Sequence, residues 1–389
     1  MSLAGDTDEN DLGEFYRRTL LDDVVPFWFP RCVDTECGGF LHSLDADGTV
    51  VDTDKSVWAQ ARMSWMLLTL HETVAARPEW REWGEHGLRF LERHCFDTDG
   101  RMFFQTARDG TPIRKRRYAF SECFAAIAYA AHARVSGSDR SAARARDLLA
   151  RFVDWNFTPG RLPAKLTDAR PMIGLSPRMM SIVTAQQLRE CLGEDSLNPL
   201  IDRFIDEIER LFCKPEIECV METVAPDGAL LDTWEGRQLN PGHAIEAAWF
   251  IMEEGRFRGD QRLIGLGCRM LDWMWKRGWD EEHGGVFYFR DVHGRPVQEY
   301  WHDMKFWWVH DEVITASLMA WRSTGREVYH DMHQRVHDWS FKTFGDPDRG
   351  EWFGYAHRDG RLSNHLKGSF WKSFFHHPRM LLNGWRLLR

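Results

Sequence analysis

The chain has 389 residues, of which 43% are hydrophobic and 28% charged, and its net charge is −9. The sequence shows no apolar run of about 18 residues and no cleavable leader, so we expect a cytoplasmic protein without a membrane partner. Because Lys and Arg are scattered and the balance is acidic, nucleic acid is not an expected partner, and a small neutral or mildly charged molecule fits better.

Apolar residues recur at helical spacing in twelve segments of the chain. Residues 1–10 are polar and are predicted to form a disordered tail, and residues 11–389 to form one catalytic domain. Short loops such as Ser136-Gly137-Ser138-Asp139 join helices in pairs, whereas longer connections separate the pairs. The predicted helices are 10–29, 54–76, 78–95, 120–136, 138–156, 177–192, 197–213, 242–256, 260–277, 310–324, 325–343 and 377–388.

The longer connections carry an internal repeat. Gly38-Gly39-Phe40 is followed by Asp47-Gly48, and the pattern returns near Gly100, Gly285 and Gly350, each time with an Asp-Gly or His-Gly pair after it. These glycines imply a period of about 60 residues, with two degenerate copies between them. Six such units predict an all-α fold, an (α/α)6 barrel of six helical hairpins with short β-hairpins in the long loops at one rim.

The first helix of several pairs is the more apolar one and still carries polar residues near its start. A buried charge is costly unless it is paired, so these residues are predicted to line a wet pocket at the centre of the barrel. For each residue alone, a helix cap or a satisfied polar group in the core is the alternative. The residues are Gln60, Arg62, Glu122, His243, Glu246, His310 and Glu312.

Several segments, taken together, resemble the N-acylglucosamine 2-epimerase family over nearly the whole chain. Each segment is a weak signal, but their order and spacing are specific. The resemblance is closest to the N-acetylglucosamine 2-epimerase branch and implies an (α/α)6 barrel. The segments are Gly38–Leu44 with Asp52–Arg62, Phe120–Phe124, Gly236–His243 with Glu246, Lys305–Glu312, Gly350–Tyr355 and Lys367–Arg379.

What the resemblance implies is proton exchange at C2 of an open-chain sugar, with essential residues at Arg62, His243, Glu246, Glu312 and His376. Epimerisation removes a proton from one face of a planar enediolate and returns one to the other face, which calls for two acid/base groups on opposite sides. Histidine populates both protonation states near neutral pH, so we assign this pair to His243 and His376.

The other three residues have predicted supporting roles. Arg62 would stabilise negative charge at O1, with a salt bridge as the alternative interpretation. Glu246 lies one helical turn beyond His243 and would orient its imidazole or raise its basicity. Glu312 would do the same for His376 or hold a sugar hydroxyl.

Six more residues complete the predicted substrate site. Two tryptophans are candidate stacking surfaces, and the polar residues are candidate partners for sugar hydroxyls. They are Trp308, Trp371, Glu122, Gln60, Asn240 and His310.

One position bears on the substrate. Relatives acting on free sugars carry a histidine at the place that aligns with Met180, so Met180 favours interconversion of N-acetylglucosamine and N-acetylmannosamine. Lys372 and the second histidine His377 depart from the branch and leave the 2-substituent open.

Three alternatives stay open at this point. A free-sugar aldose-ketose isomerase or 2-epimerase would use the same fold and residues. A glycoside hydrolase would need two carboxylates, and Glu122, Glu246 and Glu312 supply candidates. A non-catalytic binding role is suggested by the name renin-binding protein, which animal members of the branch also carry.

No metal or required cofactor is expected, because Arg62 can take the electrophilic role and the sequence has no H-E-x-x-H motif. Some members of the branch are activated by ATP, but no G-x-x-x-x-G-K-[ST] loop is present, so allosteric activation by ATP rests on the resemblance alone. Family members often form homodimers, although the sequence does not fix the oligomeric state.

Overall fold

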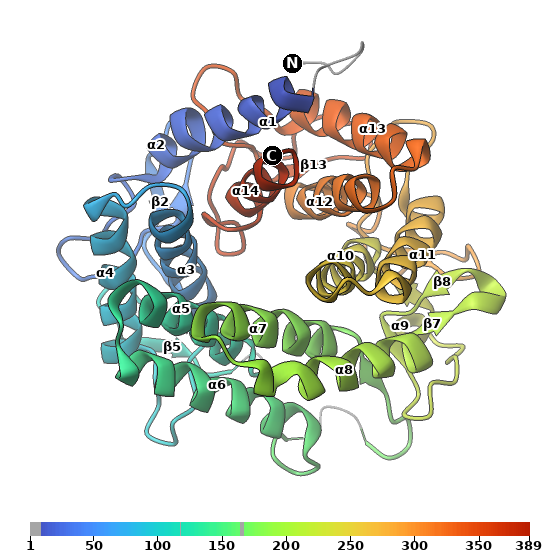
Figure 1. The fold of residues 1–389 in the computed structure, drawn as a ribbon, viewed down its shortest axis with the longest axis horizontal. Helices are drawn as coiled ribbons and strands as arrows, with labels where there is room; N and C mark the ends of the chain where they lie inside the picture. The colour runs from blue at the N-terminus through green and yellow to red at the C-terminus, as the bar shows by residue number, and fades with distance from the viewer. Residues whose placement is uncertain (1–8, 117, 164–166) are drawn as a thin grey trace.

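The computed structural model describes residues 9–116, 118–163 and 167–389. Its helices form two concentric rings (Figure 1), which confirms the predicted (α/α)6 barrel. The described part of the predicted tail, residues 9–10, already belongs to the first helix, and residues 1–8 lie outside the described residues. The inner ring consists of α3 (Val57–Thr73), α5 (Phe120–Ser136), α7 (Ser176–Leu192), α10 (Pro241–Arg258), α12 (Trp307–Thr324) and α14 (His376–Leu387).

The outer ring covers the inner one. Each outer helix packs on the inner helix that precedes it in the chain, except that α1 packs on α14, so the two ends of the chain form the sixth pair and close the ring. All twelve predicted helices are present, with bounds within a few residues of those expected. The outer helices are α1 (Glu9–Arg18) with η1 (Thr19–Val24) and α2 (Val25–Trp28), α4 (Pro78–His94), α6 (Asp139–Phe157), α8 (Asn198–Glu207) with η3 (Ile208–Phe212), α11 (Gln261–Gly278) and α13 (Glu327–Phe344).

The two rings differ in sequence because they differ in surroundings. In α5 every residue from Ser121 to Ala131 is buried, since an inner helix has neighbours on all sides. Outer helices such as α11 bury one apolar face and expose the other. The rings also approach closely: a Cβ at Gly267 of α11 would lie 2.6 Å from the carbonyl oxygen of Ala248 on α10. None of the described helices is both long and apolar enough to cross a bilayer.

Short antiparallel strands link the long loops at one rim. The strand order is β3-β4-β5 in one sheet, and β1-β2, β6-β9, β7-β8, β10-β11 and β12-β13 in the others. Three short helices, η2 (Asp195–Leu197), η4 (Pro215–Ile217) and α9 (Trp234–Arg237), also lie in connections. The strands are β1 (Ser43–Leu44), β2 (Val50–Asp52), β3 (Lys55–Ser56), β4 (Gln105–Thr106), β5 (Pro112–Arg114), β6 (Ile173–Gly174), β7 (Cys213–Lys214), β8 (Cys219–Val220), β9 (Thr223–Val224), β10 (Gln238–Leu239), β11 (Arg290–Asp291), β12 (Lys305–Phe306) and β13 (Tyr355–Ala356).

Three copies of the repeat contain an ion pair between a fully buried lysine and an aspartate. Each lysine precedes an inner helix or its first loop, and its ammonium also donates to a carbonyl oxygen of the repeat's glycine turn. The pairs are Lys55–Asp34 at 2.9 Å, Lys305–Asp280 at 3.1 Å and Lys367–Asp346 at 2.7 Å. In these copies a buried ion pair, as well as the glycine turn, therefore fixes the position of the loop relative to the inner helix.

A second cation joins two of these pairs from the next copy of the repeat. Arg108 Nε lies 2.9 Å from Asp34 Oδ2, and Arg358 Nε lies 2.8 Å from Asp280 Oδ2. Burial alone would raise the pKa of Asp34, but the hydrogen bonds from Arg108 and Lys55 hold it well below its ordinary value. Neighbouring repeats are thus joined through a shared carboxylate.

Replacing Asp34 tests how much this junction stabilises the barrel. Asp34→Ala leaves the ammonium of Lys55 buried without its carboxylate, so we expect the free energy of unfolding to fall by about 3–5 kcal/mol. Glu36→Ala is the matched control, because the exposed carboxylate of Glu36 pairs with Arg108 at the surface; the substitution should change stability by less than about 0.5 kcal/mol. Equal effects of the two substitutions in urea unfolding would contradict the assignment.

Candidate active site

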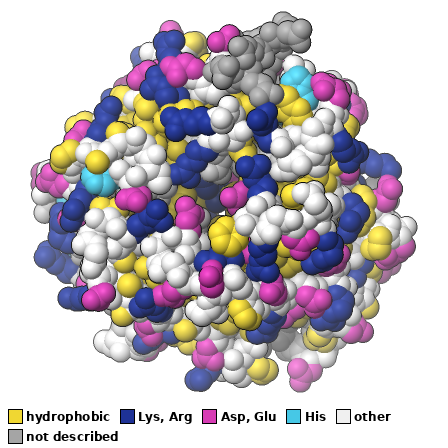
Figure 2. Space-filling model, viewed as in Figure 1, with side chains coloured by type: hydrophobic (Ala, Val, Ile, Leu, Met, Phe, Trp, Pro, Cys, Tyr) yellow, Lys and Arg dark blue, Asp and Glu magenta, His cyan; other side chains and the backbone are white. Residues whose placement is uncertain are grey.

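A cavity of about 2150 Å³ lies within the inner ring. Inner helices and the long loops line it, from Trp371 at the loops to Arg386 near the end of α14. A view along the barrel shows a hollow near the centre of the ring, where Lys and Arg side chains alternate with Asp and Glu (Figure 2). The cavity gathers side chains from helices that are far apart in the sequence.

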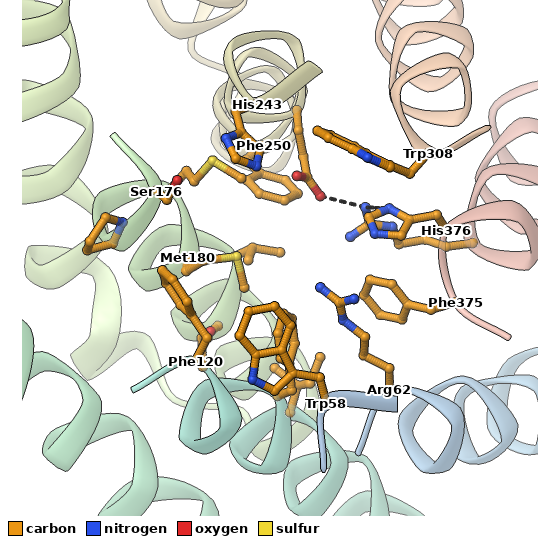
Figure 3. A pocket seen from close by; sticks show the side chains of 18 of the residues that line it. Trp58, Arg62, Phe120, Ser176, Met180, His243, Phe250, Trp308, Phe375 and His376 are labelled. Carbon is orange, nitrogen blue, oxygen red and sulfur yellow. Dashed lines mark hydrogen bonds and ion pairs between the residues drawn. The ribbon is translucent and has the colours of Figure 1, made fainter. Parts of the chain in front are cut away.

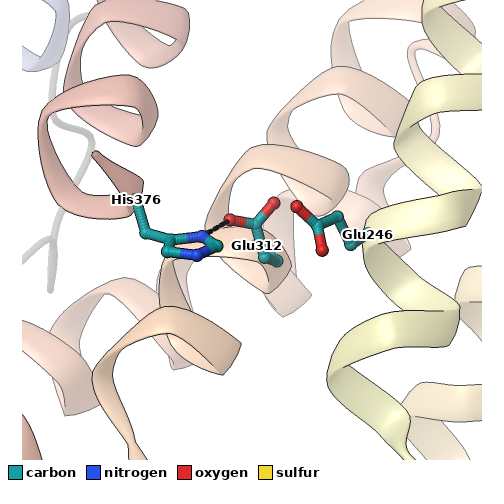
Figure 4. Close-up of side chains that lie close together, drawn as sticks. All are labelled: Glu246, Glu312 and His376. Carbon is teal, nitrogen blue, oxygen red and sulfur yellow. Dashed lines mark hydrogen bonds and ion pairs between the residues drawn. The ribbon is translucent and has the colours of Figure 1, made fainter. Parts of the chain in front are cut away.

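Three inner helices meet at a buried charge cluster beside the cavity. Glu246 of α10, Glu312 of α12 and His376 of α14 point toward one another (Figure 4). His376 Nδ1 lies 2.7 Å from Glu312 Oε1, and the second oxygen of Glu312 accepts a 2.7 Å hydrogen bond from Trp249 Nε1. Glu312 is 1% exposed, so both of its oxygens are fixed by protein donors.

Arg379 supplies the cation of this cluster. Its Nη2 donates to Glu246 Oε1 at 2.7 Å and to Glu312 Oε1 at 2.6 Å. Glu246, Glu312 and His376 also bring one ligand atom each within 4.8 Å of the others, as a metal site would. The guanidinium already bridges the two carboxylates, and its positive charge compensates theirs as a metal ion between them would.

His243 lies on another wall of the cavity, at the start of α10. Its Nδ1 lies 3.0 Å from Glu222 Oε1. Asn240 is the N-cap of the helix and accepts a hydrogen bond from the backbone N–H of His243 at 3.1 Å. The imidazole is therefore oriented by a carboxylate from the connection that precedes α10, with its Nε2 edge directed away from that carboxylate.

The two histidines have opposite electrostatic surroundings. Burial lowers the pKa of His376 well below its ordinary value, and the nearby guanidiniums of Arg379 and Arg62 lower it further. Burial acts in the same direction on His243, but the carboxylates of Glu222, Glu246 and Glu312 together outweigh it and raise the pKa above its ordinary value. His376 is thus held neutral near pH 7, and His243 is biased toward the protonated state.

Arg62 projects into the cavity from α3 (Figure 3). Its guanidinium carbon lies 3.9 Å from the ring centre of Phe124 and 4.7 Å from that of Phe375. Within the described ranges, no carboxylate forms an ion pair with Arg62, and its buried Nε has no hydrogen-bond partner. Burial lowers the pKa of Arg62 to about 10, so the residue remains cationic. Two aromatic faces hold this cation and leave its donors available.

His243 and His376 face the same space, and Trp308 lies between them along one side (Figure 3). The ring centre of Trp308 is 5.2 Å from that of His243 and 5.8 Å from that of His376. Met180 and Phe120 lie across the pocket from His376. The site therefore has a polar wall with two imidazoles and an apolar wall opposite.

The sequence profile of the family described as N-acylglucosamine 2-epimerase (GlcNAc 2-epimerase) matches residues 38–379. The chain is 35% identical to the N-acylglucosamine 2-epimerase of Bos taurus over 93% of this chain and 87% of that one. It is 33% identical to the enzyme of the same name from Homo sapiens, over 93% and 86% of the two chains. The chain belongs to the N-acylglucosamine 2-epimerase family.

A solved structure shows the same fold. The cellobiose 2-epimerase of Bacillus thermoamylovorans superposes with a TM-score of 0.84 at 18% identity, covering 97% of this chain and 99% of that one. Family membership makes the protein an isomerase, a carbohydrate epimerase.

The structure brings all five residues predicted as catalytic to the cavity or directly beside it. Arg62, His243, Glu246 and His376 line it, and Glu312 lies behind His376. The predicted pairing of Glu312 with His376 is present. Glu246 does not orient His243, because it binds Arg379 and Glu222 takes that place at the imidazole. Its charge does raise the pKa of His243, which was the other predicted role.

Three residues predicted to bind substrate lie outside the cavity lining and have structural partners instead. Gln60 accepts a hydrogen bond from the backbone N–H of Phe40 and donates to its carbonyl. Glu122 accepts from the N–H of Met102, and His310 Nε2 from that of Val286. Each side chain thus anchors a loop of the repeat to an inner helix, which corrects the prediction that polar helix starts all line a wet pocket.

The other predicted substrate residues do line the cavity. Trp308 stands between the histidines, Asn240 caps α10, and Trp371 lies in the loop before α14. Sequence reasoning missed Glu222 as a partner of His243, and it treated Arg379 only as a neighbour of the motif. Glu222 lies where the repeat is degenerate. Its position in the chain, between the segments Phe120–Phe124 and Gly236–His243, was the one sequence feature that could have suggested it.

Glu222→Gln tests the electrostatic role of this carboxylate. Because the charge of Glu222 raises the pKa of His243, its removal should lower that pKa, and turnover should fall by about 10- to 100-fold. Proton NMR titration of the His243 ring signals measures the pKa directly. Glu235→Gln is the control, since the exposed Glu235 also lines the cavity but is not bonded to His243; an unchanged His243 pKa in Glu222→Gln would refute the role.

Proposed function

We propose that this enzyme interconverts N-acetylglucosamine and N-acetylmannosamine by removing and returning the proton at C2 of the open-chain sugar. The observation that carries the proposal is the pair of imidazoles with opposite protonation preferences in one cavity. Each has its Nδ1 on a carboxylate, Glu222 or Glu312, and no described side chain hydrogen-bonds either Nε2. Two Nε2 atoms are therefore available to the two faces of C2.

In one direction, neutral His376 is the base. The C2–H bond breaks, the proton passes to Nε2 of His376, and the electron pair moves through C1 to O1 to give the enolate, which keeps the acetamido group on C2. Protonated His243 then delivers a proton from its Nε2 to the opposite face of C2, and the carbonyl at C1 reforms. In the reverse direction the two histidines exchange roles.

Arg62 stabilises the enolate in this mechanism. Negative charge develops at O1, and the guanidinium of Arg62 enters the cavity without an ion pair to any carboxylate of the described residues. A fixed donor in a site shielded from water stabilises a developing oxyanion more than it stabilises the neutral carbonyl. Phe124 and Phe375 keep the guanidinium in place, so little reorganisation accompanies the reaction.

The apolar wall supports a substrate with an N-acyl group. Met180, Phe120 and Trp58 lie across the cavity from His376 (Figure 3) and offer an apolar surface to the methyl group of an acetamido substituent. The similarity to mammalian enzymes named for N-acylglucosamine supports the same choice. Free-sugar isomerisation or 2-epimerisation is the second candidate and uses the same acid/base pair.

We further propose a cytoplasmic enzyme that acts on its sugar without a required cofactor or metal ion. A homodimer and activation by ATP remain predictions from the family resemblance.

The first test is proton NMR of N-acetylmannosamine with the protein in D2O, with and without ATP. We expect N-acetylglucosamine to appear with deuterium at C2, because a proton carried by a histidine exchanges with solvent. An unchanged spectrum would contradict the proposed substrate, and mannose and fructose would then be tried for free-sugar isomerisation.

His243→Ala and His376→Ala test the acid/base pair. Each should abolish epimerisation, since one face of C2 loses its proton carrier, while circular dichroism should show an intact barrel. Deuterium exchange at C2 of one epimer without epimerisation would identify the face that the remaining histidine serves. Near-normal turnover in either variant would remove that residue from the pair and would favour a non-catalytic role for it.

A further inference from the structure

A second histidine–carboxylate pair lies directly beside the pair of His376 and Glu312. His377 Nδ1 lies 3.1 Å from Asp311 Oδ1, and the two side chains are 1% and 0% exposed. His377 follows His376 on α14, and Asp311 precedes Glu312 on α12. The two inner helices are therefore joined at two adjacent points.

The two junctions lie on different faces of α14. Successive residues of a helix project about 100° apart, and while His376 lines the cavity, His377 packs away from it. The ring of His377 stacks on Trp352, with centroids 4.0 Å apart and planes 28° apart. His376 and Arg379, three residues apart, bond Glu312 from one face of α14, and the bond of His377 to Asp311 adds a contact on a second face, which restrains rotation of the helix about its axis.

The second pair has few other partners. Asp311 Oδ2 and His377 Nε2 are buried, and in the part of the chain that the structure describes neither has a hydrogen bond. Removing the imidazole would leave the carboxyl group of Asp311 buried without its donor. This hydrogen bond thus holds α12 and α14 together on the face turned away from the cavity, while the bonds to Glu312 hold them on the other face.

An ion pair adjoins this junction. Lys372 Nζ lies 2.7 Å from Glu351 Oε1, and Trp28 Nε1 donates to the other oxygen of Glu351 at 2.6 Å. Lys372 acts electrostatically on Asp311, as His377 does on Glu351. The structure thus places Lys372 and His377 in one buried cluster.

We propose that His377 is a positioning residue for the reaction. Its bond to Asp311 sets the rotation of α14, so that Nδ1 of His376 meets Glu312 and Nε2 faces the sugar. His377 is not among the residues that line the cavity. The inference rests on the proposed function for its kinetic consequence, since a misplacement of a reacting group by about 1 Å can cost about 100-fold in rate.

Three variants test the proposal. His377→Leu removes the donor and should lower kcat by about tenfold or more with little change in KM, because the cavity wall is unchanged. His377→Asn places an amide donor near the position of Nδ1 and should restore most of kcat. His86→Leu is the control: His86 lies on the outer helix α4 and bonds the carbonyl oxygens of Asp34 and Gly39 in the first repeat, not α12 or α14, so stability should fall without loss of kcat.

A second measurement does not depend on turnover. In protein labelled with ¹⁵N-histidine, the Nδ1–H signal of His376, assigned by its loss in His376→Ala, should shift or broaden in His377→Leu and recover in His377→Asn. That pattern in a protein without epimerase activity would support the positioning role while refuting the proposed function. Should His377→Leu not fold, His377→Gln replaces it, since its donor is displaced by one methylene and kcat should stay below that of the Asn variant.

Clear results would overturn the inference. Wild-type kcat and an unshifted His376 signal in His377→Leu would show that Asp311 and His377 do not position the base. Equal kcat in the Asn variant and in the Leu or Gln variant would show the same, because the hydrogen bond would then be irrelevant.

Discussion

The guanidinium of Arg379 between Glu246 and Glu312 is the interaction on which the site depends. Two carboxylates and an imidazole lie together in a region nearly closed to water, and such charges are tolerated only when they are paired. Arg379 provides the pairing and links α10, α12 and α14 at one level of the barrel. The same cation lies beside His376 and, after burial, is the largest effect that lowers the pKa of its imidazole. One side chain thus compensates the buried carboxylates and also favours the neutral form of the catalytic imidazole.

The reaction itself is nearly symmetric, whereas the site is not. A 2-epimerase needs an acid on one face of C2 and a base on the other, and two histidines in identical surroundings would carry the same charge. Here a carboxylate from the connection before α10 raises the pKa of His243, while burial and guanidiniums lower that of His376. Opposite protonation states can therefore coexist at one pH, and Arg62 between two aromatic rings accepts the charge that forms between them.

The fold could be predicted from the sequence because its signals are local. Helical periodicity located the segment 120–136 without error, and the glycine turns revealed a repeat that leaves few architectures open. The contacts within the site were harder to predict from the sequence. The pairing of His243 with Glu222 joins an inner helix to a connection in which the repeat is degenerate, and no local pattern encodes that contact.

Polar residues at helix starts illustrate the same limit. Gln60 and Arg62 are two positions apart on α3, yet Gln60 binds the backbone of Phe40 and Arg62 enters the cavity. Composition and spacing treat both as candidates for the pocket. The packing of the loop that contains Phe40, 20 residues before Gln60, decides which of the two side chains faces the cavity.

Closure of the ring by α1 and α14 has a consequence for synthesis on the ribosome. The helix that completes the barrel also carries His376 and Arg379, so nearly all of the chain must emerge before either the ring or the catalytic cluster exists. Until then the apolar face of the first helical segment, with Tyr16 and Leu20, lacks its inner partner. A nascent chain that stops before α14 is therefore both inactive and left with an exposed apolar seam, which makes it a natural substrate for chaperones and proteases.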